Sequence, residues 1–456
     1  MSGVEKIKID SKHLRGTLNE SLADPITGSI VENDQTVIKF HGIYQQDDRD
    51  RRAERAEKKL EKLFSFMLRL RIAGGKVTAK QWLGIHEIGK LNANATIKIT
   101  TRQTVQLHGV IKSKLKPTLS SFDQYGLDSI AACGDVNRNV MASATIAQNA
   151  AFDEVYEYSK KISDSFLPKT NAYHEIWLDK EKISPETEVD PLYGETYLPR
   201  KFKIVVAIPP HNDVDLFAHD IGLIAIIEND ELQGFNVSVG GGMGATHGNP
   251  ETYPRLGEVA GYVPKDKVVE AAYNIITIQR DFGNREERKN SRFKYTMAKY
   301  GMDWFKKEFE NRGVKLEEAR EYELTRRGDD YGWKEDYLGN HHFTLFVENG
   351  RIMGDTKKAI FEITSKDLSN IRFTNNQNLI ISDIKPENKK AVEDILASHN
   401  IADANDKSPI FLDSIACVAL NTCTLALAEA QRYLPSLIFK IEPLLEKFSL
   451  QDDNIS

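Results

Sequence analysis

Two β-rich segments, one near each end of the chain, resemble each other, and this repeat constrains the fold more than any other feature. MLRLRIAGGKV at 67–77 parallels TLFVENGRI at 344–352, and TIKITTRQTVQL at 96–107 parallels NIRFTNNQNLII at 370–381. The spacing between the two windows is nearly the same in each copy. A chance likeness of β-rich windows is the alternative. A repeat of this length predicts duplicated domains rather than a solenoid.

Alternating apolar and polar residues predict strands in the first copy, each with one basic face. In MLRLRI, Arg69 and Arg71 share a face because residues two apart on a strand point the same way. In TIKITTRQTVQLHG, Lys98 and Arg102 share a face that Gln106 continues. The second copy has apolar or amide side chains at or near the corresponding positions: Leu345, Val347 and Asn376. The sequence therefore predicts that only one copy kept a basic face.

Further basic segments repeat this pattern between the two copies. They contribute Arg138 in VNRNV, Lys201 and Lys203 in PRKFKIVV, and Arg288, Lys289, Arg292 and Lys294 in ERKNSRFKYT. Each segment alone is explained by a solvated surface. Cations gathered in one cleft repel each other, so such an arrangement is retained when a highly charged anion fills it. Together the segments predict a shared site for a polycarboxylate cofactor or a small oxyanion.

Composition excludes several other classes of protein. The chain has 456 residues, a net charge of −6 and three cysteines, too few for a disulfide scaffold and in keeping with a reducing cytosol. No apolar run is long enough for a membrane span, and the start MSGVEKIKID has no hydrophobic signal segment. Net acidity disfavours general nucleic-acid binding. We therefore expect a multi-domain cytoplasmic enzyme, with no nucleic-acid and no membrane partner.

The glycine run SVGGGMGATHGNPETYPR does not fit a nucleotide-binding motif. Counting from Gly242 and Gly244, the last glycine of a dinucleotide fingerprint would fall on His247, and no Gly-Lys-Ser/Thr follows. Two readings remain. The run is either a flexible surface loop or a place where the backbone approaches a flat ligand closely.

Two cysteines lie close together in ACVALNTCTLALAEAQRYLP. Five residues separate Cys417 from Cys423, and the composition predicts a helix that begins just after Cys423. A helix N-terminus stabilises thiolates and so favours metal ligation. Two thiolates cannot complete a zinc site or an iron–sulfur cubane, each of which takes four ligands. Structural thiols are the alternative reading of this pair.

Landmarks along almost the whole chain resemble the hemoprotein (beta) component of assimilatory NADPH-sulfite reductases, in the siroheme nitrite and sulfite reductase family. They are FHGIYQQDDRDRRAERAEKKLE, TTRQTVQLHG, DVNRNV, TYLPRKFK, GGGMGATHGN, QRDFGNREERKN and CVALNTCTLALAEAQRYLP. The resemblance implies a siroheme coupled to a [4Fe-4S] cluster and six-electron reduction of sulfite to sulfide, in sulfate assimilation and cysteine biosynthesis. It also implies that NADPH supplies electrons through a flavoprotein (alpha) component.

The resemblance implies an α+β fold with duplicated ferredoxin-like half-domains beside a larger α/β siroheme domain. It divides the chain into an N-terminal extension (1–60), a first ferredoxin-like half-domain (61–135), a first siroheme-type α/β domain (136–330), a second ferredoxin-like half-domain (331–402) and the start of a second siroheme and iron–sulfur domain (403–456).

The resemblance also implies roles for individual residues. Four match the family's sulfite-binding and proton-supplying cations: Arg69, Arg138, Lys201 and Lys203. Four match positions that contact the siroheme carboxylates: Lys98, Arg102, Gln106 and Arg292. Cys417 and Cys423 match the first two cluster ligands, whereas Cys133 matches no ligand and is expected to be a small buried residue.

The sequence departs from the family pattern at one place. The family's second cysteine pair lies in a TGCPNGC-type segment further on, and this sequence stops at DDNIS. We therefore expect two of the four cluster ligands in this chain and an incomplete second siroheme domain. A gene product truncated there is expected to fold poorly and not to reduce sulfite. Two alternatives remain: a ferredoxin-dependent nitrite or sulfite reductase, and an inactive remnant.

Overall fold

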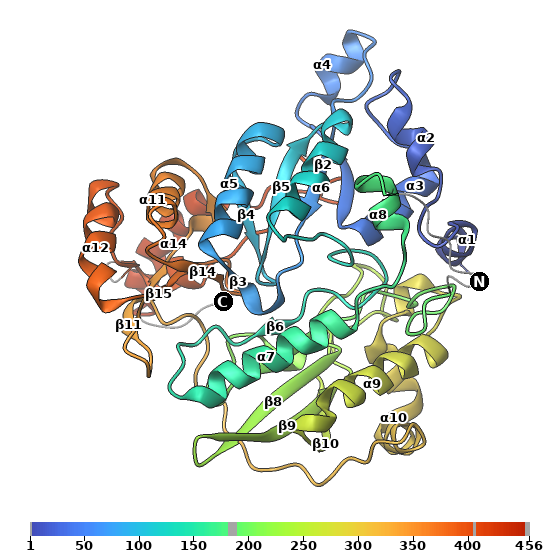
Figure 1. The fold of residues 1–456 in the computed structure, drawn as a ribbon. Coiled ribbons are helices and arrows are strands. Elements are labelled where there is room, and N and C mark those ends of the chain that lie inside the picture. The colour runs from blue at the N-terminus through green and yellow to red at the C-terminus, as the bar shows by residue number, and fades with distance from the viewer. Residues whose placement is uncertain (1, 181–188, 405–406, 452–456) are drawn as a thin grey trace.

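The computed structural model describes residues 2–180, 189–404 and 407–451. Within these ranges the strands form three five-stranded sheets, and helices cover each of them. Figure 1 shows one sheet with α7, α9 and α10 in the lower part of the view, a second with α5 and α6 above it, and the third with α11 and α12 at the left. The mixture of sheets and helices agrees with the predicted α+β class.

The first half-domain is an antiparallel sheet with two helices on one face. Its strands lie in the order β1 (Ile43–Asp47), β2 (Phe64–Arg69), β5 (Thr104–Val110), β4 (Ile97–Thr100) and β13 (Arg351–Ile352). The helices are α5 (Ala79–Asn92) and α6 (Leu115–Gln124). Ile97, Ile99 and Leu107 are fully buried, as the alternating pattern predicts.

The second half-domain has the same order of elements. Its strands are β11 (Gly332–Glu335), β12 (His341–Leu345), β15 (Leu379–Ile384), β14 (Asn370–Phe373) and β3 (Lys76–Val77), with the helices α11 (Gly354–Ser365) and α12 (Lys389–Ser398). Gln103 and Gln377 occupy the turns between the paired strands, with φ of +51° and +66°. The two copies therefore share even an uncommon backbone conformation, and the predicted duplication is confirmed.

Each half-domain contributes an edge strand to the sheet of the other. Strand β3 of the first copy pairs with β14, and strand β13 of the second pairs with β4. Both follow a tight turn, η2 (Ala73–Gly75) and η7 (Glu348–Gly350). A Cβ on Gly75 would lie 2.4 Å from the carbonyl oxygen of Phe373, and a Cβ on Gly350 would lie 3.0 Å from that of Ile99. We call this arrangement the strand exchange.

The two turns also fix which residues correspond in the two copies. Counting back from Gly75 and Gly350, Arg69 and Arg71 correspond to Thr344 and Phe346. Thr344 and Phe346 lie one residue before the expected counterparts, Leu345 and Val347. The reason is the alternation of faces along a strand: by the same count Leu345 corresponds to Leu70, a buried apolar residue next to Arg69 that points to the opposite face. The second copy still has no basic side chain at either position.

The third sheet mixes parallel and antiparallel pairs. Its order is β10 (Glu258–Pro264), β9 (Glu231–Val239), β8 (Ile221–Glu228), β7 (Ile204–Ala207) and β6 (Met141–Ala142), and β6, β7 and β8 run parallel. Helices α7 (Ala150–Ser165), α9 (Val268–Phe282) and α10 (Phe293–Glu310) lie beside it. Residues 221–226 of β8 are all buried, which explains their uninterrupted apolar run.

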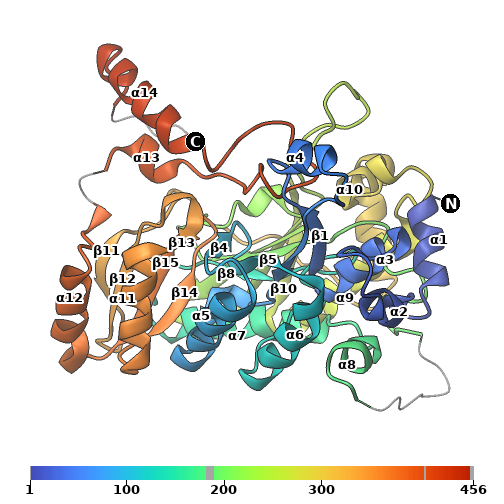
Figure 2. The ribbon, with the colours of Figure 1, turned by 90° about the horizontal axis from the view of Figure 1, so that it is seen from above.

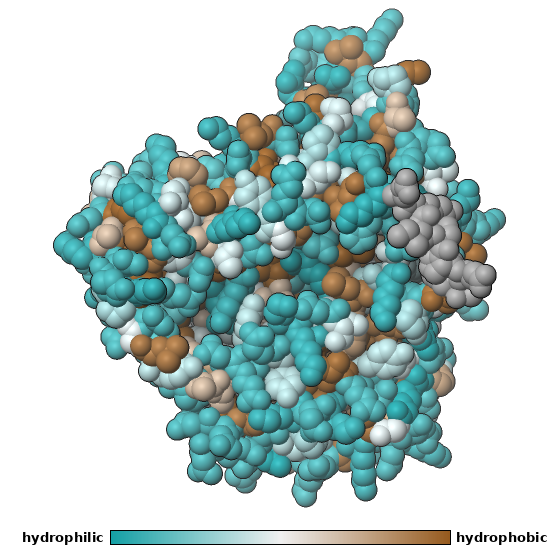
Figure 3. All heavy atoms as spheres, in the orientation of Figure 1, coloured by the Kyte–Doolittle hydropathy of each residue, from teal (hydrophilic) through white to brown (hydrophobic). Residues whose placement is uncertain are grey.

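The remaining helices lie outside these three sheets. They are α1 (Gly3–Asp10), α2 (Leu18–Ala23), α3 (Glu32–Val37), α4 (Arg52–Glu57), α8 (Ala172–Trp177), α13 (Pro409–Asp413) and α14 (Leu434–Lys447). Figure 2 shows α13 and α14 on the opposite side of the molecule from α5, α6 and α11. The face in Figure 3 is mostly hydrophilic. Among the described residues, no helix combines the length and apolarity that crossing a membrane requires.

Candidate active site

A cavity of about 350 Å³ lies where the first half-domain and the third sheet meet Asn375, in the β14–β15 turn of the second half-domain. Loops that precede or connect strands form its walls, so side chains from distant parts of the sequence meet there. Its lining includes Arg102 from the β4–β5 turn, Lys201 and Lys203 before β7, His219 and Asp220 before β8, the glycine loop at 241–244, and Arg292 before α10. Four of the residues predicted from sequence therefore surround one cavity.

Arg102 carries hydrogen-bond donors that no described residue satisfies. Its Nη2 donates to the carbonyl oxygens of Asn139 and Ile204, but its buried Nε and Nη1 have no hydrogen-bond partner. Burial, followed by the charge of Arg138, lowers the pKa of Arg102 to about 9. Leaving a charged group buried with unpaired donors is costly, and a negative charge in the cavity that Arg102 lines would offset that cost.

Lys201 and Lys203 lie in an extended segment from which Phe202 points into the core, as the alternation predicts. Burial and the charge of Arg138 lower the pKa of Lys201 to about 6. Burial and the charge of Arg102 lower the pKa of Lys203 to about 7. Both ammonium groups therefore lose their protons near neutral pH unless a negative charge enters the cavity.

The sequence argument missed Asp220, a carboxylate placed among these cations. Its Oδ2 accepts from the backbone N–H of Lys203 at 2.9 Å, and burial raises its pKa to about 6. It is 5% exposed and lies where Lys203, Arg292 and Arg102 all act on its charge. The signal in the sequence was a polar His-Asp pair directly before the apolar run of β8.

The glycine loop lines the cavity at 241–244, whereas residues 243–248 are exposed, so the approach of its backbone to a flat ligand stays a prediction. A Cβ on Gly244 would lie 2.8 Å from Nη1 of Arg292, and a Cβ on Gly241 would lie 2.1 Å from the carbonyl oxygen of Phe217. Gly241 and Gly242 are buried. The glycines therefore let backbone and basic side chains share the same wall of the cavity.

Arg69, Arg138 and Gln106 are predicted site residues that do not line this cavity. Arg138 donates from Nε to the carbonyl oxygen of Gly134 at 2.8 Å, and its charge acts on Lys201, Lys203 and Arg102. Arg69 donates from Nη1 to Sγ of Cys133 at 3.3 Å, and Cys133 is buried, as expected.

Gln106 lies opposite Arg69 in the β2–β5 pair. An arginine can only donate, so the amide oxygen of Gln106 faces Arg69 and its amide nitrogen faces Nε2 of His108. The pair extends the basic face next to the cavity.

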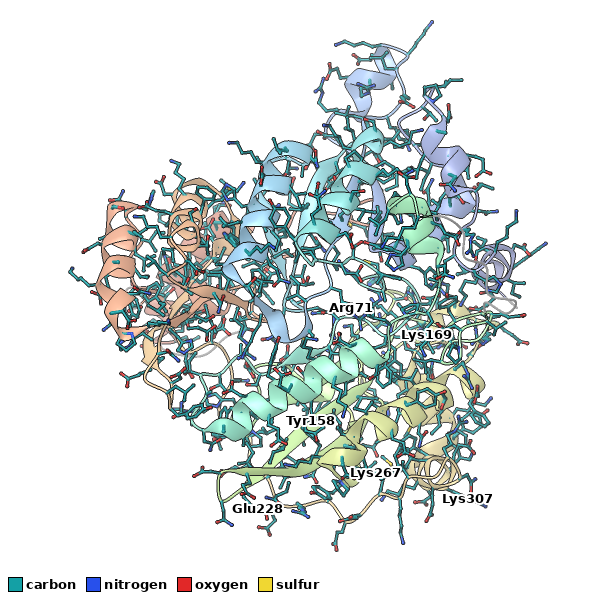
Figure 4. All side chains as sticks on the ribbon, in the orientation of Figure 1. Arg71, Tyr158, Lys169, Glu228, Lys267 and Lys307 are labelled. Carbon is teal, nitrogen blue, oxygen red and sulfur yellow. The ribbon has the colours of Figure 1, made fainter. Side chains whose placement is uncertain are left out.

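Arg71 lies two residues after Arg69, but its side chain binds backbone carbonyl groups. Its Nη1 donates to the carbonyl oxygen of Asn137 at 3.1 Å, and its Nη2 donates to that of Ser163 at 2.6 Å. Ser163 belongs to α7, so Arg71 ties β2 to that helix. Figure 4 shows Arg71 near the centre of the molecule, between the first sheet and α7.

Lys98 lies apart from the cavity, in a buried position between the two half-domains. Its Nζ donates to the carbonyl oxygens of Asn349 and, at 2.9 Å, Ala416, and it is 2% exposed. Burial and the charge of Arg351 lower its pKa to about 7. The geometry places this lysine beside the residue before Cys417, and the predicted contact with siroheme stays a prediction.

Residues 416–432 form an irregular segment that we call the cysteine loop. Cys417 is exposed and Cys423 is half-buried. The helix predicted directly after Cys423 is wrong, because α14 begins only at Leu434. The carbonyl oxygens of Cys423 and Ala426 accept instead from the side chain of Arg49.

The described residues do not complete a metal site at this loop. They hold no group of three or more His, Cys, Asp or Glu side chains arranged to bind a metal ion. A cubane takes four ligands, usually thiolates. That Cys417 and Cys423 supply two of these ligands stays a prediction.

Comparisons with known proteins bear directly on this site. A model of the nitrite and sulphite reductase 4Fe-4S domain matches residues 157–316, and a model of the nitrite/sulfite reductase ferredoxin-like half domain matches 59–125 and 334–399. The sulfite reductase [NADPH] hemoprotein beta-component of Leptospira biflexa is 56% identical over 99% of this chain and 83% of its own length. The chain belongs to the nitrite and sulfite reductase family. It is therefore an oxidoreductase by family.

A second relative and one solved structure are also similar to this chain. The sulfite reductase [NADPH] hemoprotein beta-component of Bacillus pumilus is 50% identical over 100% of this chain and 81% of its own length. The solved structure of the Mycobacterium tuberculosis NirA protein superposes with a TM-score of 0.79 at 23% identity, over 99% of this chain and 78% of that one. This likeness confirms the fold.

The cavity gives a testable pH dependence. Sulfate, a dianion that resembles sulfite, is expected to bind more weakly as pH rises through about 6 to 7, because Lys201 and Lys203 attract it only when protonated and their pKa values lie there. The affinity is expected to fall by up to about tenfold per pH unit for each lysine that binding must protonate. Calorimetry in buffers of different ionisation enthalpy is expected to show proton uptake, which Lys203→Met reduces. A sulfate affinity that does not change with pH would contradict the role of Lys201 and Lys203 in attracting the anion.

Proposed function

We propose that this chain reduces sulfite to sulfide in a six-electron reaction, with a siroheme and a [4Fe-4S] cluster as cofactors. The observation that carries the proposal is the guanidinium of Arg102, buried with two nitrogen atoms unpartnered beside Lys201 and Lys203. A macrocycle with several carboxylates and a doubly charged oxyanion together supply the negative charge that this cavity lacks.

The proposal divides the basic residues between the two anions. To the siroheme carboxylates we assign Arg102 and Arg292 in the cavity wall, with Gln106 and Lys98 on the adjoining strands. To sulfite we assign Lys201 and Lys203, with Arg69 and Arg138 next to them. Cys417 and Cys423 would each provide one thiolate to the cluster. When bound, the cluster and siroheme would pass electrons from the external donor to sulfite.

Lys201 and Lys203 are the proposed proton donors of the reaction. Each oxygen that leaves sulfite does so as water, so the reaction consumes protons at those oxygen atoms. A proton donor works best when its pKa lies near the working pH. With pKa values of about 6 and 7, Nζ of Lys201 and Nζ of Lys203 meet that condition.

We further propose that NADPH is the source of the electrons, through a separate flavoprotein (alpha) component. Support comes from the relatives, which carry the name hemoprotein beta-component. The sequence has no Gly-x-Gly-x-x-Gly fingerprint in its glycine run and so offers no nicotinamide site there. This arrangement places the chain in sulfate assimilation and cysteine biosynthesis.

The optical spectrum of the purified chain tests the proposal. We expect siroheme absorption bands, cluster iron, and sulfide formed from sulfite when a reduced viologen dye supplies electrons. Electron delivery by NADPH with the flavoprotein supports the proposed donor, and delivery by ferredoxin alone would instead favour the ferredoxin-dependent alternative. A colourless chain that binds neither cofactor under reconstitution would overturn the proposal and favour an inactive remnant.

A further inference from the structure

One conspicuous stretch of the sequence has no part in the proposed function. The run QQDDRDRR connects β1 to α4, close to the cysteine loop. Figure 2 shows the cysteine loop extending from α13 toward α4. The backbone N–H of Arg49 donates to the carbonyl oxygen of Asn421 at 3.0 Å, so a residue of this run pairs directly with the loop.

The side chain of Arg49 makes the stronger contacts. Its Nη1 donates to the carbonyl oxygens of both Cys423, at 3.0 Å, and Ala426, at 2.5 Å. The loop has neither a helix nor a strand between Cys423 and α14, so its carbonyl groups need partners from elsewhere. A half-buried guanidinium offers charge-assisted donors, which are stronger than neutral ones.

The other cysteine is held in a comparable way. Lys98 donates from Nζ to the carbonyl oxygen of Ala416, the residue directly before Cys417, at 2.9 Å. Each of the two cysteines therefore has a cation fixed to its own carbonyl group or to the one before it.

We propose that Arg49 is a positioning residue for the cysteine loop, which it holds in shape so that Cys423 is presented as a cluster ligand. The inference rests on the proposed function for the identity of the ligand that Cys423 receives. The effect of Arg49 on the shape of the loop is inferred from the geometry of the chain alone. Arg432, at the far end of the loop, pairs with Asp50 only at the exposed surface and contributes less.

Hydrogen exchange in the iron-free chain of 456 residues tests the positioning role. Arg49→Ala is expected to speed exchange of the Cys423 and Ala426 amides by about tenfold or more, the change expected from losing a charge-assisted hydrogen bond. Both amides donate within the loop, to Ala419 and Cys423 respectively. Amides of β8 and β9 are expected to exchange as before, which shows that the rest of the fold is intact.

The matched control is Arg51→Ala. Arg51 lies two residues away and pairs with Glu54 at 2.6 Å on the surface, with its side chain 49% exposed. Loop exchange that is the same in Arg49→Ala and Arg51→Ala would overturn the proposal. If Arg49→Ala does not fold, Arg49→Lys replaces it: the charge stays, the planar fork is lost, and exchange must exceed that of Arg51→Lys.

Iron uptake separates this inference from the proposed function. After reconstitution with ferrous iron and sulfide, Arg49→Ala is expected to bind less iron than the Arg51→Ala chain, and Arg49→Lys is expected to recover part of the loss. Failure of the unsubstituted chain to bind any iron would count against the proposed function. The exchange rates of the iron-free chains would still decide the role of Arg49.

Discussion

Replacing Lys201 by alanine is expected to lower the rate of sulfite reduction by about 10²- to 10⁴-fold, the contribution usually made by a positioned proton donor. The same loss is expected for Lys203→Ala. Siroheme absorption per chain is expected to stay unchanged, because the cofactor carboxylates are assigned to other cations. Turnover with a viologen donor and the optical spectrum measure the two quantities on the same sample.

Two further variants separate proton delivery from anion binding. Lys201→Arg keeps the positive charge, but a guanidinium does not release its proton near neutral pH. It is therefore expected to retain the KM for sulfite and lose kcat. Lys267→Ala removes an exposed lysine that pairs with Glu270 and is expected to change neither. Loss of siroheme from both alanine variants would show that the lysines bind the cofactor instead.

Gly75→Ala is expected to lower the free energy of unfolding by about 3 kcal/mol or more. The residue has a φ of +76°, which costs a side chain about 1–2 kcal/mol. The new Cβ would also lie 2.4 Å from the backbone oxygen of Phe373, and such overpacking costs about 1–3 kcal/mol. Urea titration followed by circular dichroism measures the change.

A second glycine provides the control for this prediction. Gly126 has a φ of +65°, and a Cβ placed on it meets no atom within 4 Å. Gly126→Ala therefore carries the conformational strain without the steric clash, and its cost is expected to stay near 1–2 kcal/mol. Equal losses in the two variants would show that the contact at Gly75 relaxes freely.

The sequence predicted the duplication because alternation and turn chemistry are local properties. Gln103 and Gln377 were aligned correctly because both copies need the same left-handed turn. Arg102, Lys201, Lys203 and Arg292 were placed at one cavity because each belongs to a recognisable basic segment. Local patterns of charge and polarity were sufficient for these features.

Other features depend on contacts between distant residues and could not be predicted locally. Arg71 alternates with Arg69, yet it donates to the backbone of α7. Lys98 shares the basic strand pattern but is buried against carbonyl groups of the other half-domain and of the cysteine loop. The helix expected after Cys423 is replaced by turns that bind Arg49, which is 374 residues away along the chain.

The strand exchange has a consequence for how the molecule can come apart. Each half-domain needs a strand from the other to complete its sheet. A protease cut in the connection between them would therefore not release an independently folded domain. Each half expressed alone would have an unpaired strand at the edge of its sheet. Partial unfolding of one half must strip a strand from the other. The two copies are therefore expected to melt in a single transition, and their edge strands are expected to change in step during evolution.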